Sequence, residues 1–200
     1  MMLVEQTTVP GTALPVSQFK DHLRLGTGFA DGALQDEVLE AYLRAAMSAI
    51  EARIGKALIS RSYSWTLTAW RDLAAQVLPI APVRAITGLT IVDRLGAEEV
   101  IDPARYGLEP DRHRPKLVAR SLLLPAIPVG GKAVIAFEAG FGPGWDDLPA
   151  DLKQAVLMLA AQFYENRGTG LAGEGRIPPA VAALIGSYRN LRLFGGGGVR

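Results

Sequence analysis

The chain has 200 residues, 49% of them hydrophobic, which is enough to bury the core of one globular domain or of one domain that carries an insertion. Its 21 lysine and arginine residues nearly balance its 20 aspartate and glutamate residues, so the net charge of +1 does not indicate a protein that wraps nucleic acid or lies on an anionic membrane. The absence of cysteine excludes disulfides and thiolate chemistry; without a signal-peptide pattern or an apolar run near the roughly 20 residues of a membrane span, we expect a protein made and used in a cytoplasm.

The first part of the chain predicts an arm followed by two helices. Residues 1–14 are mostly small or polar and have no hydrophobic periodicity, which predicts a flexible N-terminal arm. A short helix is expected next, ending at Gly26. Over residues 35–54 apolar side chains recur at intervals of three and four, the pattern of a long amphipathic helix. Residues 15–58 are therefore expected to supply the N-terminal helices of a bundle.

Residues 59–139 are expected to form an antiparallel β subdomain. Tyr63, Trp65 and Leu67 alternate with serine and threonine, which is the period of a half-buried strand. Further short strands are bounded by proline, glycine or aspartate, at 76–80, 86–93, 98–101, 116–119 and 132–138. This spacing indicates an antiparallel meander or a small sandwich.

The helical pattern returns in residues 140–194. Pro149 suits the first turn of a helix whose broad apolar face continues to Asn166, and a last helix is expected to carry its apolar face as far as Leu191. The glycine-rich residues 195–200 are expected to form a flexible tail. The predicted fold class is α+β: a bundle of about four helices, with a small antiparallel β subdomain inserted between the N-terminal and C-terminal helix pairs.

Patterns that could indicate chemistry are weak in this sequence. Residues 168–173 match G-x-G-x-x-G, but they follow a helix instead of a strand and lie just before two prolines, which favours an interhelical loop over a nucleotide site. His22 and His113 have no second ligand at metal-binding spacing. Asp111, His113 and Ser121 could be imagined as a hydrolase triad, but no nucleophile elbow accompanies them. We therefore expect no catalytic residue, no cofactor and no metal site.

Two groups of side chains are candidates for contacts with other molecules. Four arginines form a basic stretch in the predicted β subdomain, Arg105, Arg112, Arg114 and Arg120. They could touch DNA phosphates, although a solvated or subunit-contacting loop is the favoured interpretation. The tryptophans Trp65, Trp70 and Trp145 are predicted to anchor a core or an interface instead of stacking on bases.

Three stretches share the pattern of one known family. They are residues 16–24, residues 39–58, and residues 134–142 with 148–156 and 163–167. In this order they resemble the opening helix, the second helix running into the first strand, and the later core of the phage head-tail connector, or adaptor, family, which includes members from long-tailed phages and gene transfer agents. The resemblance extends from about residue 16 to residue 167, and its specificity comes from the order of the stretches together with the Tyr164-Glu165-Asn166-Arg167 ending.

This resemblance implies a structural, non-enzymatic protein of the virion or phage-like particle neck, assembled in the bacterial cytoplasm. Such subunits form a homo-oligomeric ring, typically a dodecamer, under the portal protein and above the next neck protein, the stopper, with DNA passing through the lumen. Because family members engage the portal through a C-terminal helix or arm, the expected portal-binding residues are Tyr188, Arg189, Arg192, Leu193 and Phe194. The alternatives are another neck protein (a stopper or tail-completion protein), a small nucleotide-binding enzyme that uses residues 168–173, and a DNA-binding protein.

Overall fold

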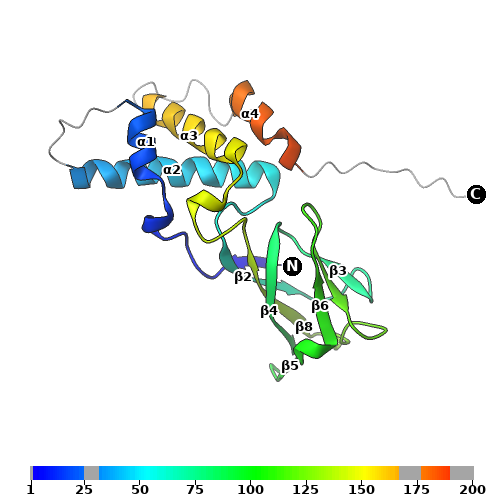
Figure 1. Cartoon of the computed structure of the whole chain (residues 1–200). Helices are drawn as coiled ribbons and strands as arrows, with labels where there is room; N and C mark the ends of the chain where they lie inside the picture. Colours follow the sequence, from blue (N-terminus) through cyan, green and yellow to red (C-terminus); the bar gives the residue numbers. More distant parts are fainter. Residues whose placement is uncertain (1, 25–31, 167–176, 190–200) are drawn as a thin grey trace, which may run out of the picture.

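The computed structural model describes residues 2–24, 32–166 and 177–189, and it divides the chain into a helical layer and a β layer (Figure 1). The helices are α1 (Val16–His22), α2 (Gly32–Ile54), α3 (Ala150–Glu165) and α4 (Pro179–Ile185). The strands are β1 (Met2–Glu5), β2 (Arg61–Leu67), β3 (Ala75–Val77), β4 (Val83–Val92), β5 (Glu98–Val100), β6 (Tyr106–Glu109), β7 (Lys116–Ala119) and β8 (Lys132–Ala139). Short 3-10 turns lie at Gly11–Ala13, Pro103–Arg105, Trp145–Asp147 and Gly186–Tyr188. The α+β class is confirmed.

The helical layer is built around α2 and α3, which pack against each other along apolar stripes. Leu39, Leu43 and Ile50 of α2 are separated by four and seven residues, which places their side chains on one helix face, and each is fully buried. Leu152 and Val156 of α3 belong to the same core. In the part of the chain that the structure describes, no helix is long and apolar enough to cross a membrane.

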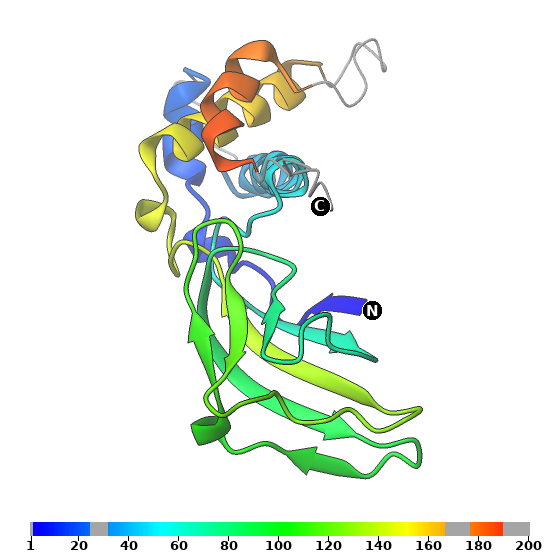
Figure 2. The same cartoon turned by 90° about the vertical axis from the view of Figure 1, so that its right-hand side faces the viewer.

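The β layer consists of two antiparallel sheets that pack face to face. The larger sheet has the order β1-β2-β8-β4-β5 and the smaller one β3-β7-β6. Figure 2 shows the five strands of the larger sheet following one another from β1, beside the helical layer, to β5 at the far side. Trp65, Leu89, Leu117 and Phe137 lie in the core of this layer. The alternation in β2 is as predicted, since Tyr63, Trp65 and Leu67 are all buried.

The N-terminal segment differs from the flexible arm that the sequence predicted for residues 1–14. Met2–Glu5 pairs with β2 as an edge strand, and Val9 and Leu14 are only 6% and 7% exposed. Strands β2 to β8 do lie between α2 and α3 in chain order, but β1 precedes α1. The larger sheet is therefore assembled from two separate parts of the chain, because an extended segment can satisfy its backbone groups on any free edge nearby.

Two of the three chain crossings between the layers, α2 to β2 and β8 to α3, are hydrogen-bonded to each other. Ser60 N donates to Gly142 O at 2.8 Å, and Phe141 N donates to Leu58 O at 2.9 Å. Gly140 has φ +140°, and a Cβ there would lie 2.4 Å from the backbone N of Ser60, so only glycine allows this close approach. The layers are consequently fastened together at this junction by backbone contacts.

Candidate interaction sites

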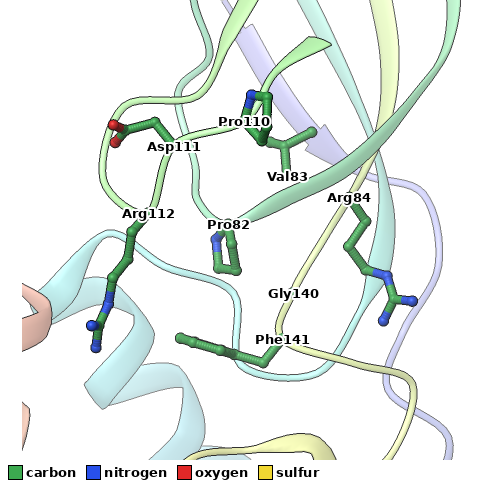
Figure 3. Close-up of a pocket in the computed structure, with 8 residues that line it drawn as sticks. All are labelled: Pro82, Val83, Arg84, Pro110, Asp111, Arg112, Gly140 and Phe141. Atoms are coloured by element: carbon green, nitrogen blue, oxygen red, sulfur yellow. The ribbon is translucent and has the colours of Figure 1, made fainter.

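A groove open to solvent lies where the β layer meets the helical layer. Its volume is about 540 Å³, and it is lined by Pro82, Val83, Arg84, Pro110, Asp111, Arg112, Gly140 and Phe141. Figure 3 shows Phe141 lying between the side chains of Arg84 and Arg112. The lining thus combines prolines, a valine and an aromatic ring with three charged side chains, those of Arg84, Asp111 and Arg112.

The β6–β7 connection, residues 110–115, contains a hydrogen-bonded turn at this groove. Asp111 Oδ1 accepts hydrogen bonds from the backbone N of His113 at 2.7 Å and of Arg114 at 2.6 Å. These bonds hold the pKa of the Asp111 carboxyl below its ordinary value, because they favour its charged form. The carboxylate therefore acts as a turn-forming group of this loop.

Lys56, a residue that the sequence did not indicate as functional, contacts this loop from its buried side. Its side chain is 1% exposed, and its Nζ donates to the backbone O of Arg112. Burial, followed by the neighbouring Arg112 charge, lowers the pKa of Lys56. The buried cation anchors the loop, and no local sequence pattern could have indicated it, because its partner is 56 positions away.

Tyr188, predicted as a portal anchor, lies in the interior of the described chain. It is 3% exposed, and its Oη donates to Asp151 Oδ1 at 2.7 Å. The Arg112 guanidinium lies 4.7 Å from its ring centroid, and the Phe141 ring meets it edge-on with centroids 6.0 Å apart. Burial and the hydrogen bond to Asp151 raise the pKa of Tyr188 to about 12. Tyr188 thus fixes the end of the last helical segment, and the exposed Arg189 follows it.

The remaining predicted portal-binding residues, Arg192, Leu193 and Phe194, lie outside the described residues. So do residues 168–173, which carry the glycine pattern considered for nucleotide binding.

The four arginines of the basic stretch form two separate pairs. Arg105 and Arg120 lie side by side, since Arg120 N donates to Arg105 O at 3.0 Å. Arg112 and Arg114 lie on the connecting loop at the other end of the β6–β7 hairpin, because the register pairs Tyr106 with Ala119 and Glu109 with Lys116. All four residues are exposed, but they do not make one continuous basic surface.

The residues considered for catalysis are not brought together. Asp111 binds the backbone of His113, whereas Ser121 lies beyond the opposite end of the hairpin and its Oγ donates to Leu123 O at 3.1 Å. His22 is exposed in the last turn of α1. Over the described ranges, no group of three or more histidine, aspartate and glutamate side chains could hold a metal ion.

The tryptophans are core residues, in agreement with the sequence. Trp65 and Trp145 are 2% and 6% exposed, and Trp145 Nε1 donates to Gln18 Oε1 at 2.9 Å. Trp70 packs partly buried against the β core, and its Nε1 donates to Pro125 O at 2.7 Å. The indole N–H groups of Trp70 and Trp145 thus have partners in the fold, as buried tryptophans usually require.

Comparison with solved structures gives matches that extend over nearly the whole chain, among them three chains from gene transfer agent particles. A chain in the neck of an empty gene transfer agent particle, computed with C6 symmetry, is 54% identical, with a TM-score of 0.88 over 98% of this chain and 99% of its own. A chain in the virion of a native gene transfer agent particle is 54% identical at the same coverage, with a TM-score of 0.86. A chain in the neck of a native particle computed with C12 symmetry is 49% identical at the same coverage, with a TM-score of 0.84. No protein-family model and no curated protein matches the sequence.

Proposed function

This chain belongs to the family of neck proteins of gene transfer agent particles, and we propose that it acts there as a structural head-tail connector, or adaptor, subunit. In this role it forms a ring under the portal, joins the capsid to the tail and lets DNA pass. The observation that carries the proposal is the 54% identity to a neck chain over 98% of the sequence, with a TM-score of 0.88.

The side-chain chemistry of the fold supports a structural role. Asp111 and Lys56 have the polar contacts of turn-forming and loop-anchoring groups, and Glu51 binds Arg61 across the layers with N–O distances of 2.7 Å. Lys56 and Glu51 thereby connect the end of the α2 segment to the β layer. A subunit that transmits load between a capsid and a tail needs such a junction.

A ring of identical copies, twelve in the favoured form, is supported by the C6 and C12 symmetries used for the related necks. In a ring each copy meets its two neighbours through two different surfaces. The exposed arginine pairs, Arg105 with Arg120 and Arg112 with Arg114, are proposed to contact a neighbouring subunit or the DNA in the lumen. The net charge of +1 suits a channel through which DNA must move without being held.

The portal-binding residues are proposed to lie C-terminal to Tyr188. Buried Tyr188 fixes the start of the C-terminal segment, and Arg189 with Arg192, Leu193 and Phe194 supplies the contacts with the portal. Ordering such a segment costs about 1 to 2 kcal/mol per residue, so its contacts are expected to form on the portal surface. The opposite side of the ring is proposed to meet the stopper.

A different neck protein, such as a stopper or tail-completion protein, is the second candidate. A chain dominated by β structure would favour it, whereas the helical core here includes α1 and α2 as well as α3 and α4. The portal is therefore the partner to test first.

The test is sedimentation velocity of the cognate portal mixed with the full chain or with a version that ends after Arg189. This end point keeps Ile185 and Tyr188, which are 1% and 3% exposed and belong to the helical core. We expect the full chain to cosediment with the portal and the shortened chain to lose at least about tenfold in affinity, a difference of roughly 1.4 kcal/mol. A matched control is Leu122→Lys, at a side chain that is 87% exposed in the β layer. A full chain that does not bind the portal would overturn the proposal.

A further inference from the structure

The first strand of the larger sheet is ordered without burying any of its own side chains. All four residues of β1 are exposed, and Met2, Leu3 and Val4 are 61%, 39% and 38% exposed. The segment is held by its ladder with β2, by the Glu5 ion pair with Arg61 at 3.3 Å, and beyond the strand by Gln6 N, which donates to Ser62 O at 2.8 Å. The side of β1 that faces away from β2 has no partner strand in the described chain. Three consecutive apolar residues on a free sheet edge are a template for pairing with another chain.

The same sheet also ends in an exposed strand on its other side. Glu98, Glu99 and Val100 of β5 are all exposed, and Val100 is 76% exposed. The strand registers pair Met2 with Thr66, Thr66 with Val134, Val134 with Thr90, and Thr90 with Val100. Met2 and Val100, exposed apolar residues at the two edges, therefore lie in line across the sheet. Figure 2 shows β1 and β5 at opposite limits of the sheet.

A head-to-tail ring requires two different contact surfaces on each copy, and the related neck chains occur in particles computed with C6 and C12 symmetry. A sheet with two exposed edges on opposite sides meets this requirement. We infer that the free edge of β1 is a subunit interface, covered by an extended segment of the neighbouring copy of this chain. Backbone hydrogen bonds to β1 would give the pairing its register, and apolar contacts to Met2, Leu3 and Val4 would exclude water from both faces. This inference rests on the ring proposed above and assigns one of its contact surfaces.

The experiment places the photo-crosslinking residue p-benzoylphenylalanine at Leu3 and irradiates portal-bound assemblies whose rings have been verified by negative-stain electron microscopy. We expect covalent dimers and higher multimers of this chain, with the partner peptide identified by mass spectrometry. The same residue at Leu122, which is 87% exposed, is the positional control and should give a different set of partner peptides. Verified rings in which Leu3 crosslinks only to the portal, only within its own chain or to nothing would overturn the inference and leave the connector role standing.

A second variant gives an independent readout. Leu3→Lys adds a charge of the kind that blocks edge pairing, and we expect it to raise the concentration for half-maximal ring formation at least about tenfold. Its melting temperature should match that of the unaltered chain, because no side chain of β1 is buried. Rings that form equally well with Leu3→Lys would count against the inference. Failure of even the unaltered chain to form rings on the portal would instead remove the proposed function, and this interface with it.

Discussion

The guanidinium of Arg112 lies 4.7 Å from the ring centroid of Tyr188. The sequence placed these residues in two different candidate sites, one for DNA or subunit contacts and one for the portal. In the fold they touch, and Lys56 holds the backbone of Arg112 from the buried side. The β6–β7 loop and the start of the C-terminal segment are therefore in direct contact.

Arg112→Ala should lower the free energy of unfolding by about 0.5 to 1 kcal/mol, the usual strength of a cation–π contact at an exposed site. The loss should largely disappear when Tyr188→Leu has already removed the ring. A double-mutant cycle in urea measures this coupling. Arg114→Ala, at an exposed arginine of the same loop, is the control. Equal losses with and without the Tyr188 ring would contradict the contact.

Alkaline solution should destabilise the fold through its buried tyrosines. Burial raises the pKa of Tyr63 and of Tyr188 to about 12, from 10.0 in an ordinary environment. The neutral phenols therefore contribute stability that is fully present below about pH 10 and is lost as the pH rises toward 12, because the unfolded chain loses these protons first. The contribution of each is at most about 2.7 kcal/mol. Urea unfolding at about pH 9 and pH 11 should show a smaller loss for the Tyr63→Phe/Tyr188→Phe variant, and an unchanged loss would argue against the assignment.

Glu51→Gln should be strongly destabilising, because Glu51 links the end of α2 to β2. Its carboxylate accepts from Arg61 Nη2 at 2.7 Å and from Leu58 N at 2.7 Å, and the Glu51 and Arg61 side chains are only 15% and 10% exposed. Glu5 remains as a second partner of Arg61 at 3.3 Å, so we expect the loss of the Glu51 charge to cost about 1 to 3 kcal/mol.

The matched control for Glu51→Gln is Glu109→Gln. Glu109 forms a pair with Lys116 at the same 2.7 Å, but the two side chains are 53% and 37% exposed. An exposed pair is worth less than about 1 kcal/mol, so chemical denaturation should separate the two variants clearly. Similar losses in both would show that Glu51 and Arg61 are not a structural link between the layers.

Gly140→Ala should prevent the two chain crossings from closing. A Cβ at Gly140 would lie 2.4 Å from backbone atoms of Ser60, whereas at Gly88 the nearest atom to a new Cβ is 3.8 Å away. We expect Gly140→Ala to lower stability by more than about 3 kcal/mol, and Gly88→Ala to change it by less than about 1 kcal/mol. Thermal unfolding compares them, and a Gly140→Ala variant as stable as Gly88→Ala would contradict the junction geometry.

Elements whose burial follows a local period could be predicted from the sequence. The helix expected over 35–54 is α2, the alternation around Trp65 is β2, and Pro149 precedes α3 directly. In each case the spacing of the apolar residues indicates which face of the helix or strand packs on the core. The last helix is shorter than expected: it ends at Ile185, and a 3-10 turn continues to Tyr188.

Features that depend on distant partners could not be predicted. β1 buries no side chain, so its sequence has no alternation of apolar and polar residues that would indicate a strand. β6 is only four residues long and contains Gly107, so its strand pattern is too short to recognise. The burial of Lys56 depends on a carbonyl in another layer, and the division of the four arginines into two pairs depends on a hairpin register. Such contacts arise only when the two layers meet.

Cryo-electron microscopy of the cognate portal mixed with the full chain shows directly whether this chain forms a ring on the portal. We expect an added ring, with twelve copies of this chain, at one end of the portal, and a much smaller fraction of ringed portals with the version that ends after Arg189 at the same limiting concentration. Portal particles that carry no added density at saturating concentrations of the full chain would overturn the connector role.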